Sequence, residues 1–342
     1  MSSGADDSPG VETGGSRLPV TNSTPARDDD PNTRRPERLT ASDGVTLRRE
    51  MMDPTVDRGA DAVRWDEARR RWREYVEETA ATSLVFEGPE GQRGYSDRSH
   101  RWSPEYRERQ YARLKDMERG IGAFYGDPWT ALLTFTASSD EVPNPVDHLG
   151  QLVDGRAAVI QALRRVLDGR TWDYWWVLEP HESGYLHLHL AVVVEGAIPE
   201  VAFRPVMEAH VRQVPAAGRE AHRVDPDDAD DDGAVQVRSG REIENLTAYL
   251  NSYLGGYETE ALEMPENEQA AAAVLWATGK RQTGASRRLR QFMKGNVMPE
   301  DREEAWEFVA ILDADGEERP IDSGAPGGVD TFETQVTWGP PG

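Results

Sequence analysis

The stretch from residue 175 to residue 194, WWVLEPHESGYLHLHLAVVV, constrains the fold more than any other part of the chain. Residues 174–178 and 186–194 form two short apolar runs of β-prone residues. Pro180 and the pair Ser183-Gly184 lie between these runs and favour a turn. The pattern therefore predicts a β-hairpin, around which the rest of the chain must fold.

The predicted hairpin brings together side chains that can bind a metal ion. Side chains alternate along a strand, so His187 and His189 point to one face and Leu188 points to the other. If the hairpin closes around Ser183, Glu179 lies opposite His187 on the histidine face. Two imidazoles and a carboxylate suit a divalent metal ion that keeps positions open for water or substrate.

The composition narrows both the chemistry and the setting. The chain has no cysteine, which excludes disulfides and thiolate ligands, so a metal must be bound by nitrogen and oxygen. The 62 acidic residues outnumber the 39 Lys and Arg residues, of which only three are lysines, and the net charge is −23. Concentrated salt makes such a surface tolerable, because it shortens the Debye length to roughly 3 Å. We therefore predict a halophilic source.

The ends and the hydropathy of the chain give no sign of membrane targeting. The N-terminal residues MSSGADDSPG lack the charged and apolar regions of a signal peptide. No apolar run approaches the ~20 residues that a membrane span requires. We expect a cytoplasmic protein without a membrane partner.

The order of the patterns predicts an α+β fold in several parts. Residues 1–55 lack periodicity and are expected to form a disordered arm, followed by a helical accessory region over 56–125. The core is expected over 126–256, with an acidic insertion at about 224–233. A C-terminal helical and basic region at 257–311 and a flexible tail at 312–342 complete the plan.

Within the core, local patterns predict the elements that flank the hairpin. The alternating, β-prone sequence TALLTFTAS predicts a strand, and two stretches of helical spacing follow. Gly155 weakens the middle of the first of these helices. The predicted elements are a strand at 130–137, a helix at 146–167, a helix at 201–212 and a strand at 234–238.

A helix with two tyrosines follows the core strands. In REIENLTAYLNSYLGGYETE, leucines and tyrosines form a stripe at helical spacing, and Gly255-Gly256 ends the pattern. Tyr249 and Tyr253 lie one turn apart on one face. Packing of these rings in the core is the alternative to a chemical role.

The basic residues are concentrated near the C-terminus. One run, GKRQTGASRRLRQFMKG, stands out in an otherwise acidic chain, and a solvated helix face is the alternative to a functional patch. We predict that it contacts DNA through Lys280, Arg281, Arg287, Arg288, Arg290 and Lys294.

Together these groups suit transesterification of a phosphodiester. A divalent ion at Glu179, His187 and His189 would polarise the phosphate oxygens. A tyrosine hydroxyl would attack phosphorus to give a covalent intermediate. The 3′ hydroxyl that leaves would be conserved for religation or priming.

Over roughly residues 130–293 the chain resembles the HUH endonucleases, and among them the rolling-circle replication initiators of haloarchaeal plasmids and small haloarchaeal viruses. TFTAS at 134–138 is similar to the strand of the first motif. His187-Leu188-His189 matches the second motif, within EPHESGYLHLHL, and AYLNSYL at 248–254 matches the third. LWATGKR at 275–281 also looks like the C-terminal part of the haloarchaeal group.

The resemblance implies a central, mostly antiparallel sheet of about five strands flanked by helices. It also implies a Mg²⁺ or Mn²⁺ ion held by the two histidines and a third polar residue, for which Glu179, His181 and Glu182 remain open. Tyr249 would form a 5′-phosphotyrosine, and Tyr253 would act in the second cleavage.

The implied partners are single-stranded or hairpin origin DNA and the host replication machinery. A host helicase is needed because the chain has no G-x-x-x-x-G-K-[ST] phosphate loop. Many relatives place a lysine three residues after the first tyrosine, where this chain has Ser252. A basic residue between 280 and 294 could supply that charge.

Three other kinds of function are alternatives to a replication initiator. An HUH-type transposase or relaxase uses the same motifs, and a non-catalytic protein could bind an origin or regulate transcription without cutting. A nucleotidyl hydrolase with a histidine triad would need a third histidine at 191, where this chain has Ala191.

Overall fold

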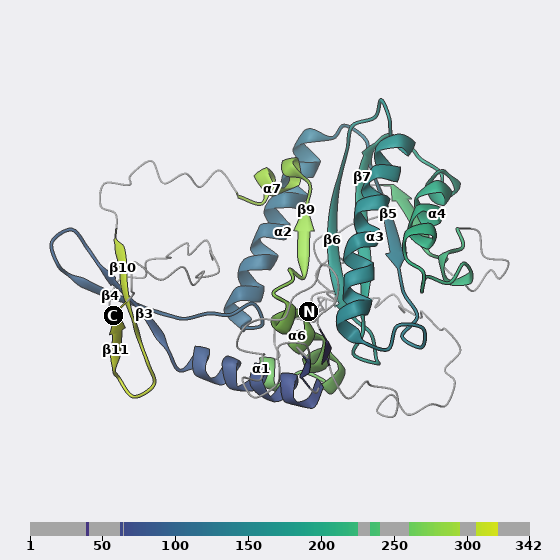
Figure 1. The fold of residues 1–342 in the computed structure, drawn as a ribbon. Coiled ribbons are helices and arrows are strands. Elements are labelled where there is room, and N and C mark those ends of the chain that lie inside the picture. The colour runs from purple at the N-terminus through teal and green to yellow at the C-terminus, as the bar shows by residue number, and fades with distance from the viewer. Residues whose placement is uncertain are drawn as a thin grey trace, which may run out of the picture.

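The structure is a computed structural model, and Figure 1 shows its fold. It describes residues 39–40, 62–63, 65–224, 233–239, 260–294 and 306–320. Most of the predicted N-terminal arm, the acidic insertion and the tyrosine helix lie outside these ranges. No helix in the described part is long and apolar enough to cross a membrane.

A five-stranded antiparallel sheet forms the centre of the molecule, which confirms the predicted α+β class. The strand order is β8-β5-β7-β6-β9, so the histidine strand β7 is central (Figure 1). Because β7 is paired on both sides and covered on both faces, most of its residues are buried, as its long apolar run requires. The strands are β5 (Pro128–Phe135), β6 (Trp172–Pro180), β7 (Leu186–Glu195), β8 (Val235–Ser239) and β9 (Thr283–Ala285).

One face of the sheet packs against α3 (Pro145–Val166) and α4 (Arg204–Gln213) in a core that includes Leu188 and Leu190. Asn144 caps α3 by accepting a hydrogen bond from the backbone N–H of Val146. Gly155 has a packing role beyond its low helix propensity. A Cβ atom at this position would lie 2.6 Å from Cγ2 of Val214, so glycine permits the close approach of the segment after α4.

The opposite face packs against α2 (Pro104–Phe124) and α7 (Arg287–Phe292). Its core contains Val177, Ala191 and Val193, whose odd positions share the face of His187 and His189. The other α-helices of the described ranges are α1 (Trp65–Ala80) and α6 (Glu266–Thr278), which pack together. The short helices η2 (Glu200–Phe203), η3 (Glu220–His222) and η4 (Ala261–Glu263) connect these elements.

A second, four-stranded sheet was not predicted. Its order is β11-β10-β3-β4, and in Figure 1 it lies on the far side of α2 from the central sheet. Phe86 and Phe308 are paired on neighbouring strands of this sheet, and their ring centroids lie 5.6 Å apart. Its strands are β3 (Ser83–Glu87), β4 (Arg93–Asp97), β10 (Glu307–Leu312) and β11 (Glu318–Pro320).

This sheet corrects two expectations about secondary structure. The region 56–125 contains the predicted helices, as α1 and α2, but also the β3–β4 hairpin. Residues 313–320, assigned to the flexible tail, belong to the β10–β11 hairpin. The signal was missed because these strands are short, β4 and β11 are polar, and β3 pairs with β10, which lies more than two hundred residues later in the chain. A further two-residue pair joins β1 (Leu39–Thr40) to β2 (Ala62–Val63).

Candidate functional site

The β6–β7 hairpin has the register that its sequence predicts. Glu179 pairs with His187, and Val177 pairs with His189. The turn spans residues 181–185, in which the backbone N–H of His181 donates to the carbonyl of Tyr185 at 2.7 Å. Gly184 adopts a φ of +82°, which favours glycine. The hairpin therefore closes around Ser183 and places Glu179, His187 and His189 on one face.

His189 is held between two neighbouring strands. Its Nε2 atom lies 2.5 Å from Oε2 of Glu179, and the two atoms touch without the alignment of a hydrogen bond. Its Nδ1 atom lies 3.2 Å from Oγ1 of Thr134, which is its register partner on β5. Such an outer hydrogen bond orients a metal-binding imidazole, so Thr134 is a positioning residue. Sequence reasoning missed this role, although Thr134 opens the TFTAS motif.

His187 is half-buried beside the exposed His181. Their rings stack with centroids 4.7 Å apart, whereas the His187 and His189 centroids lie 6.4 Å apart. Loss of solvation holds the pKa of His187 well below its usual range, and the neighbouring histidines lower it further. His187 is therefore neutral at neutral pH, with a nitrogen lone pair available for a metal ion.

The donor set fits a divalent ion by chemistry, but the side chains are not spread around one. Among the described residues, no three His, Asp or Glu side chains form a group that could hold a metal ion. Two ligands of one ion lie roughly 3 Å apart, given metal–ligand distances of about 2.1 Å. The 2.5 Å contact of Glu179 with His189 would therefore have to open slightly to admit an ion.

The other predicted third ligands lie in the turn. His181 is exposed, and its Nδ1 atom lies 3.1 Å from Oγ of Ser183. Glu182 is also exposed. Of the three candidates, Glu179 is the one in contact with His189, whereas His181 contacts His187.

The segment that follows β5 is held by three further histidines. His210 and His148 donate from Nε2 to the carbonyls of Thr136 and Ala137, at 3.1 and 3.0 Å. His222 instead accepts from the backbone N–H of Thr136 at 3.1 Å. Burial is the main cause that lowers the pKa of each, to about 4 for His148 and His210. These neutral rings hydrogen-bond the backbone of residues 136–137 and so hold the segment directly after β5, the strand that carries Thr134.

The predicted basic patch is divided by the fold. Arg288 is half-buried, contacts Asp173 at 3.1 Å and lies over the ring of Phe124 at 4.3 Å. The buried Asp173 also accepts hydrogen bonds from Tyr125 and Ser286, at 2.8 and 2.5 Å. This network attaches α7 to β6, so Arg288 has a structural role.

The remaining cations of the run lie at or near the surface. Leu178 donates its backbone N–H to the carbonyl of Gln282 at 2.8 Å, next to the Val177–Thr283 pair. Arg281 lies two residues before β9, at the end of the sheet where β6 carries Glu179. The exposed members are Arg281, Arg287, Arg290 and Lys294, whereas Lys280 is half-buried.

The predicted nucleophiles Tyr249 and Tyr253 lie outside the described residues, so their place relative to the histidines stays a prediction. The family of the chain is shown by comparison with known families. Residues 35–330 match the family described as "Putative rep protein (DUF1424)". The chain belongs to this rep family.

Two proteins similar to this chain come from Halobacterium. An "Uncharacterized 36 kDa protein" of Halobacterium salinarum is 39% identical over 282 residues, which cover 79% of this chain and 89% of the relative. A protein with the same description from Halobacterium sp. (strain GN101) is 38% identical over 289 residues, covering 78% and 87%. No solved structure matches the chain.

Proposed function

We propose that this rep protein is a rolling-circle replication initiator of a haloarchaeal element, which nicks and rejoins one strand of its origin DNA. The observation that carries the proposal is the hairpin face on which Glu179 and His187 pair across two strands and His189 contacts both Glu179 and Thr134. The family description supports the same role, and the relative from Halobacterium salinarum supports a haloarchaeal source.

The residues of the hairpin would hold the ion and keep it oriented. His187, His189 and Glu179 would bind Mg²⁺ or Mn²⁺, with Nδ1 of His189 donating to Thr134. The ion, when bound, would polarise the phosphate oxygens of the scissile group. Arg281, which lies two residues before β9, would neutralise charge on the phosphate where Ser252 replaces the lysine of many relatives.

The nucleophile of the proposed reaction is Tyr249. Its oxygen would bond to phosphorus while the bond to the 3′ oxygen breaks, and the phenolic proton would be lost as the leaving oxygen gains one. The product would be a 5′-phosphotyrosine and a free 3′ hydroxyl. Tyr253 would attack in the cleavage that ends a round, and a host helicase would separate the strands.

The test is formation of a covalent adduct on a denaturing gel. Single-stranded oligonucleotides that tile the replicon are incubated with the protein and Mn²⁺. We expect one oligonucleotide to become attached, with loss of the adduct on chelation and in Tyr249→Phe. Tyr257→Phe, which lies beyond Gly255-Gly256, is the matched control and should keep it. Nicking that survives both chelation and Tyr249→Phe would reject the mechanism.

A non-catalytic origin-binding protein is the second candidate. The observation that favours it is the contact between Glu179 and His189, which leaves no room for an ion without a shift of side chains. Sequence-specific binding without an adduct under any divalent ion would support this candidate. An adduct formed on a transposon end or a transfer origin would instead identify a transposase or a relaxase.

A further inference from the structure

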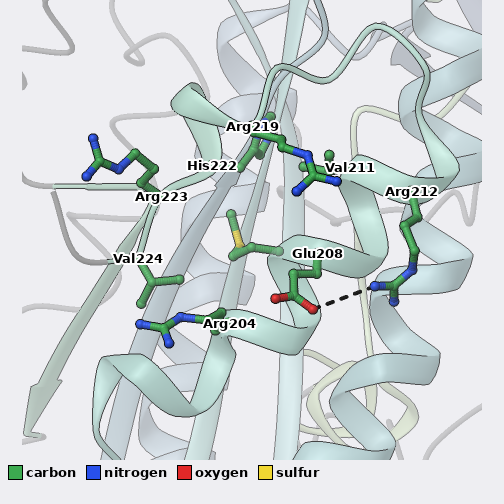
Figure 2. Close-up of a pocket in the computed structure, with 9 residues that line it drawn as sticks. Arg204, Glu208, Val211, Arg212, Arg219, His222, Arg223 and Val224 are labelled. Carbon is green, nitrogen blue, oxygen red and sulfur yellow. Dashed lines mark ion pairs between the residues drawn. The ribbon is translucent and has the colours of Figure 1, made fainter.

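A pocket of about 480 Å³ lies between α4 and the segment that leads to β8 (Figure 2). It is separate from the histidine face, because α4 packs on the Leu188 and Leu190 side of the sheet, whereas His187 and His189 lie on the other side. The pocket is lined by Arg204, Met207, Glu208, Val211, Arg212, Arg219, His222, Arg223 and Val224.

One wall of the pocket is a single stripe of α4. Arg204, Met207, Glu208, Val211 and Arg212 follow helical spacing and therefore share one side of the helix. The other wall comes from residues 219–224. Figure 2 shows Arg204 on the first of these walls and Arg219 on the second.

The lining has the opposite charge from the chain as a whole. Four guanidinium groups line the pocket against the single carboxylate of Glu208, in a chain of net charge −23. Glu208 contacts Arg212 at 3.6 Å, and Arg223 contacts Glu220 at 2.8 Å. Arginines collected in one pocket of so acidic a protein favour an anionic ligand.

The floor of the pocket is uncharged. Met207 and Val224 are buried apolar residues, and His222 beside them is also buried. His222 donates from Nδ1 to the carbonyl of Gly218 at 2.6 Å and accepts at Nε2 from Thr136, so both ring nitrogens are satisfied in the neutral form. An uncharged floor below a cationic rim suits a ligand with a phosphate and a less polar body.

We propose that this pocket binds the phosphate of a nucleotide unit, with the phosphate at an arginine of the rim, Arg204 or Arg219, and the sugar or base over Met207 and Val224. The volume lies within the range of small-molecule sites, roughly 300–1,000 Å³. A DNA strand and a free nucleotide both carry this phosphate chemistry, and the two probes of the test below distinguish them. The inference does not depend on the tyrosine chemistry proposed above.

The test measures binding to two probes, a labelled oligothymidylate and deoxyadenosine 5′-monophosphate. The variant is Arg204→Gln with Arg219→Gln, and Arg70→Gln is the matched control, since Arg70 is an exposed arginine of α1 paired with Glu74. Both are compared with the wild type across a KCl series. Arg219→Gln alone serves if the double variant fails to fold, as judged by its melting transition.

We expect the double variant to bind at least one probe about tenfold or more weakly, the factor of one lost charge-assisted hydrogen bond. Its slope of log affinity against log salt for the oligonucleotide should fall by about 0.7 for each lost phosphate contact. Weakening for the oligonucleotide alone identifies a strand site, and weakening for both probes identifies a nucleotide site.

Two results would overturn the inference: unchanged affinity for both probes, or an equal loss in Arg70→Gln. Retained pocket binding in a protein that forms no covalent adduct would separate failure of the nicking proposal from failure of this one.

Discussion

Acid should destabilise this fold through its buried histidines. The pKa values of His100, His148 and His210 are lowered to about 4, chiefly because burial removes water from the rings. In the unfolded chain a histidine titrates near 6.5, so the unfolded state binds protons first as the pH falls. The contribution of these rings to stability is therefore fully present above about pH 6.5 and is lost as the pH falls toward 4.

The expected size of the effect is large relative to the stability of a domain. A histidine whose pKa moves from about 6.5 to about 4 on folding lowers the free energy of unfolding by about 2 kcal/mol between pH 7.5 and pH 5. Three such residues give roughly 6 kcal/mol, against a usual total of about 5–15 kcal/mol. Near pH 5 the protein should be close to unfolding.

The assay is chemical unfolding at several pH values in molar KCl, where screening suppresses repulsion among the carboxylates. His148→Gln keeps an N–H donor for the carbonyl of Ala137 but does not titrate, so it should remove about 2 kcal/mol of the pH dependence. His181→Gln, on the exposed turn, is the control. A wild-type free energy of unfolding that stays constant from pH 7.5 to 5, or a full pH dependence in His148→Gln, would refute the reasoning.

Three further predictions concern orientation, packing and salt. Thr134→Val removes the partner of Nδ1 of His189 and should lower the rate of nicking about tenfold to a hundredfold. The free energy of unfolding should fall by only about 1 kcal/mol. A variant that nicks as fast as the wild type would exclude the positioning role. Gly155→Ala introduces a Cβ 2.6 Å from Val214 and should lower the free energy of unfolding by about 1–3 kcal/mol. Gly122→Ala, with open space around the new Cβ, should raise the free energy of unfolding by up to about 1 kcal/mol. Similar melting temperatures for the two variants would contradict this packing. In molar salt, counterion release contributes little to DNA affinity, so the protein should bind its origin more tightly than a scrambled oligonucleotide. Filter binding measures both affinities. Equal affinities would show that the protein does not read the bases or the shape of the origin.

Local patterns sufficed where an element is specified by its own residues. The hairpin and a helix close to residues 145–166 follow from alternation, helical spacing and turn chemistry. The pairing of Glu179 with His187 follows from the length of the turn, because a five-residue loop around Ser183 fixes the register.

Features that depend on distant partners could not be predicted in this way. The contact between Thr134 and His189 requires β5 to pair with β7, and the contact of the half-buried Arg288 with Asp173 requires α7 to pack next to β6. The arginine pocket combines a helical stripe with residues from a loop beyond it, so no run of basic residues reveals it. Basic residues that are close in sequence need not form one surface: within residues 280–294, Arg288 is half-buried against Asp173, whereas other basic residues are exposed.

The most direct test of the central claim is to locate the covalent bond by mass spectrometry. The protein is reacted with the oligonucleotide that it nicks, the DNA is trimmed by nuclease, and the tryptic peptide 242–280 is fragmented. The account predicts a nucleotide phosphate attached to Tyr249 in the wild type and its absence in His189→Ala. Attachment to a residue outside the Tyr249–Tyr253 pair, or an unmodified peptide in a protein that still nicks, would contradict it.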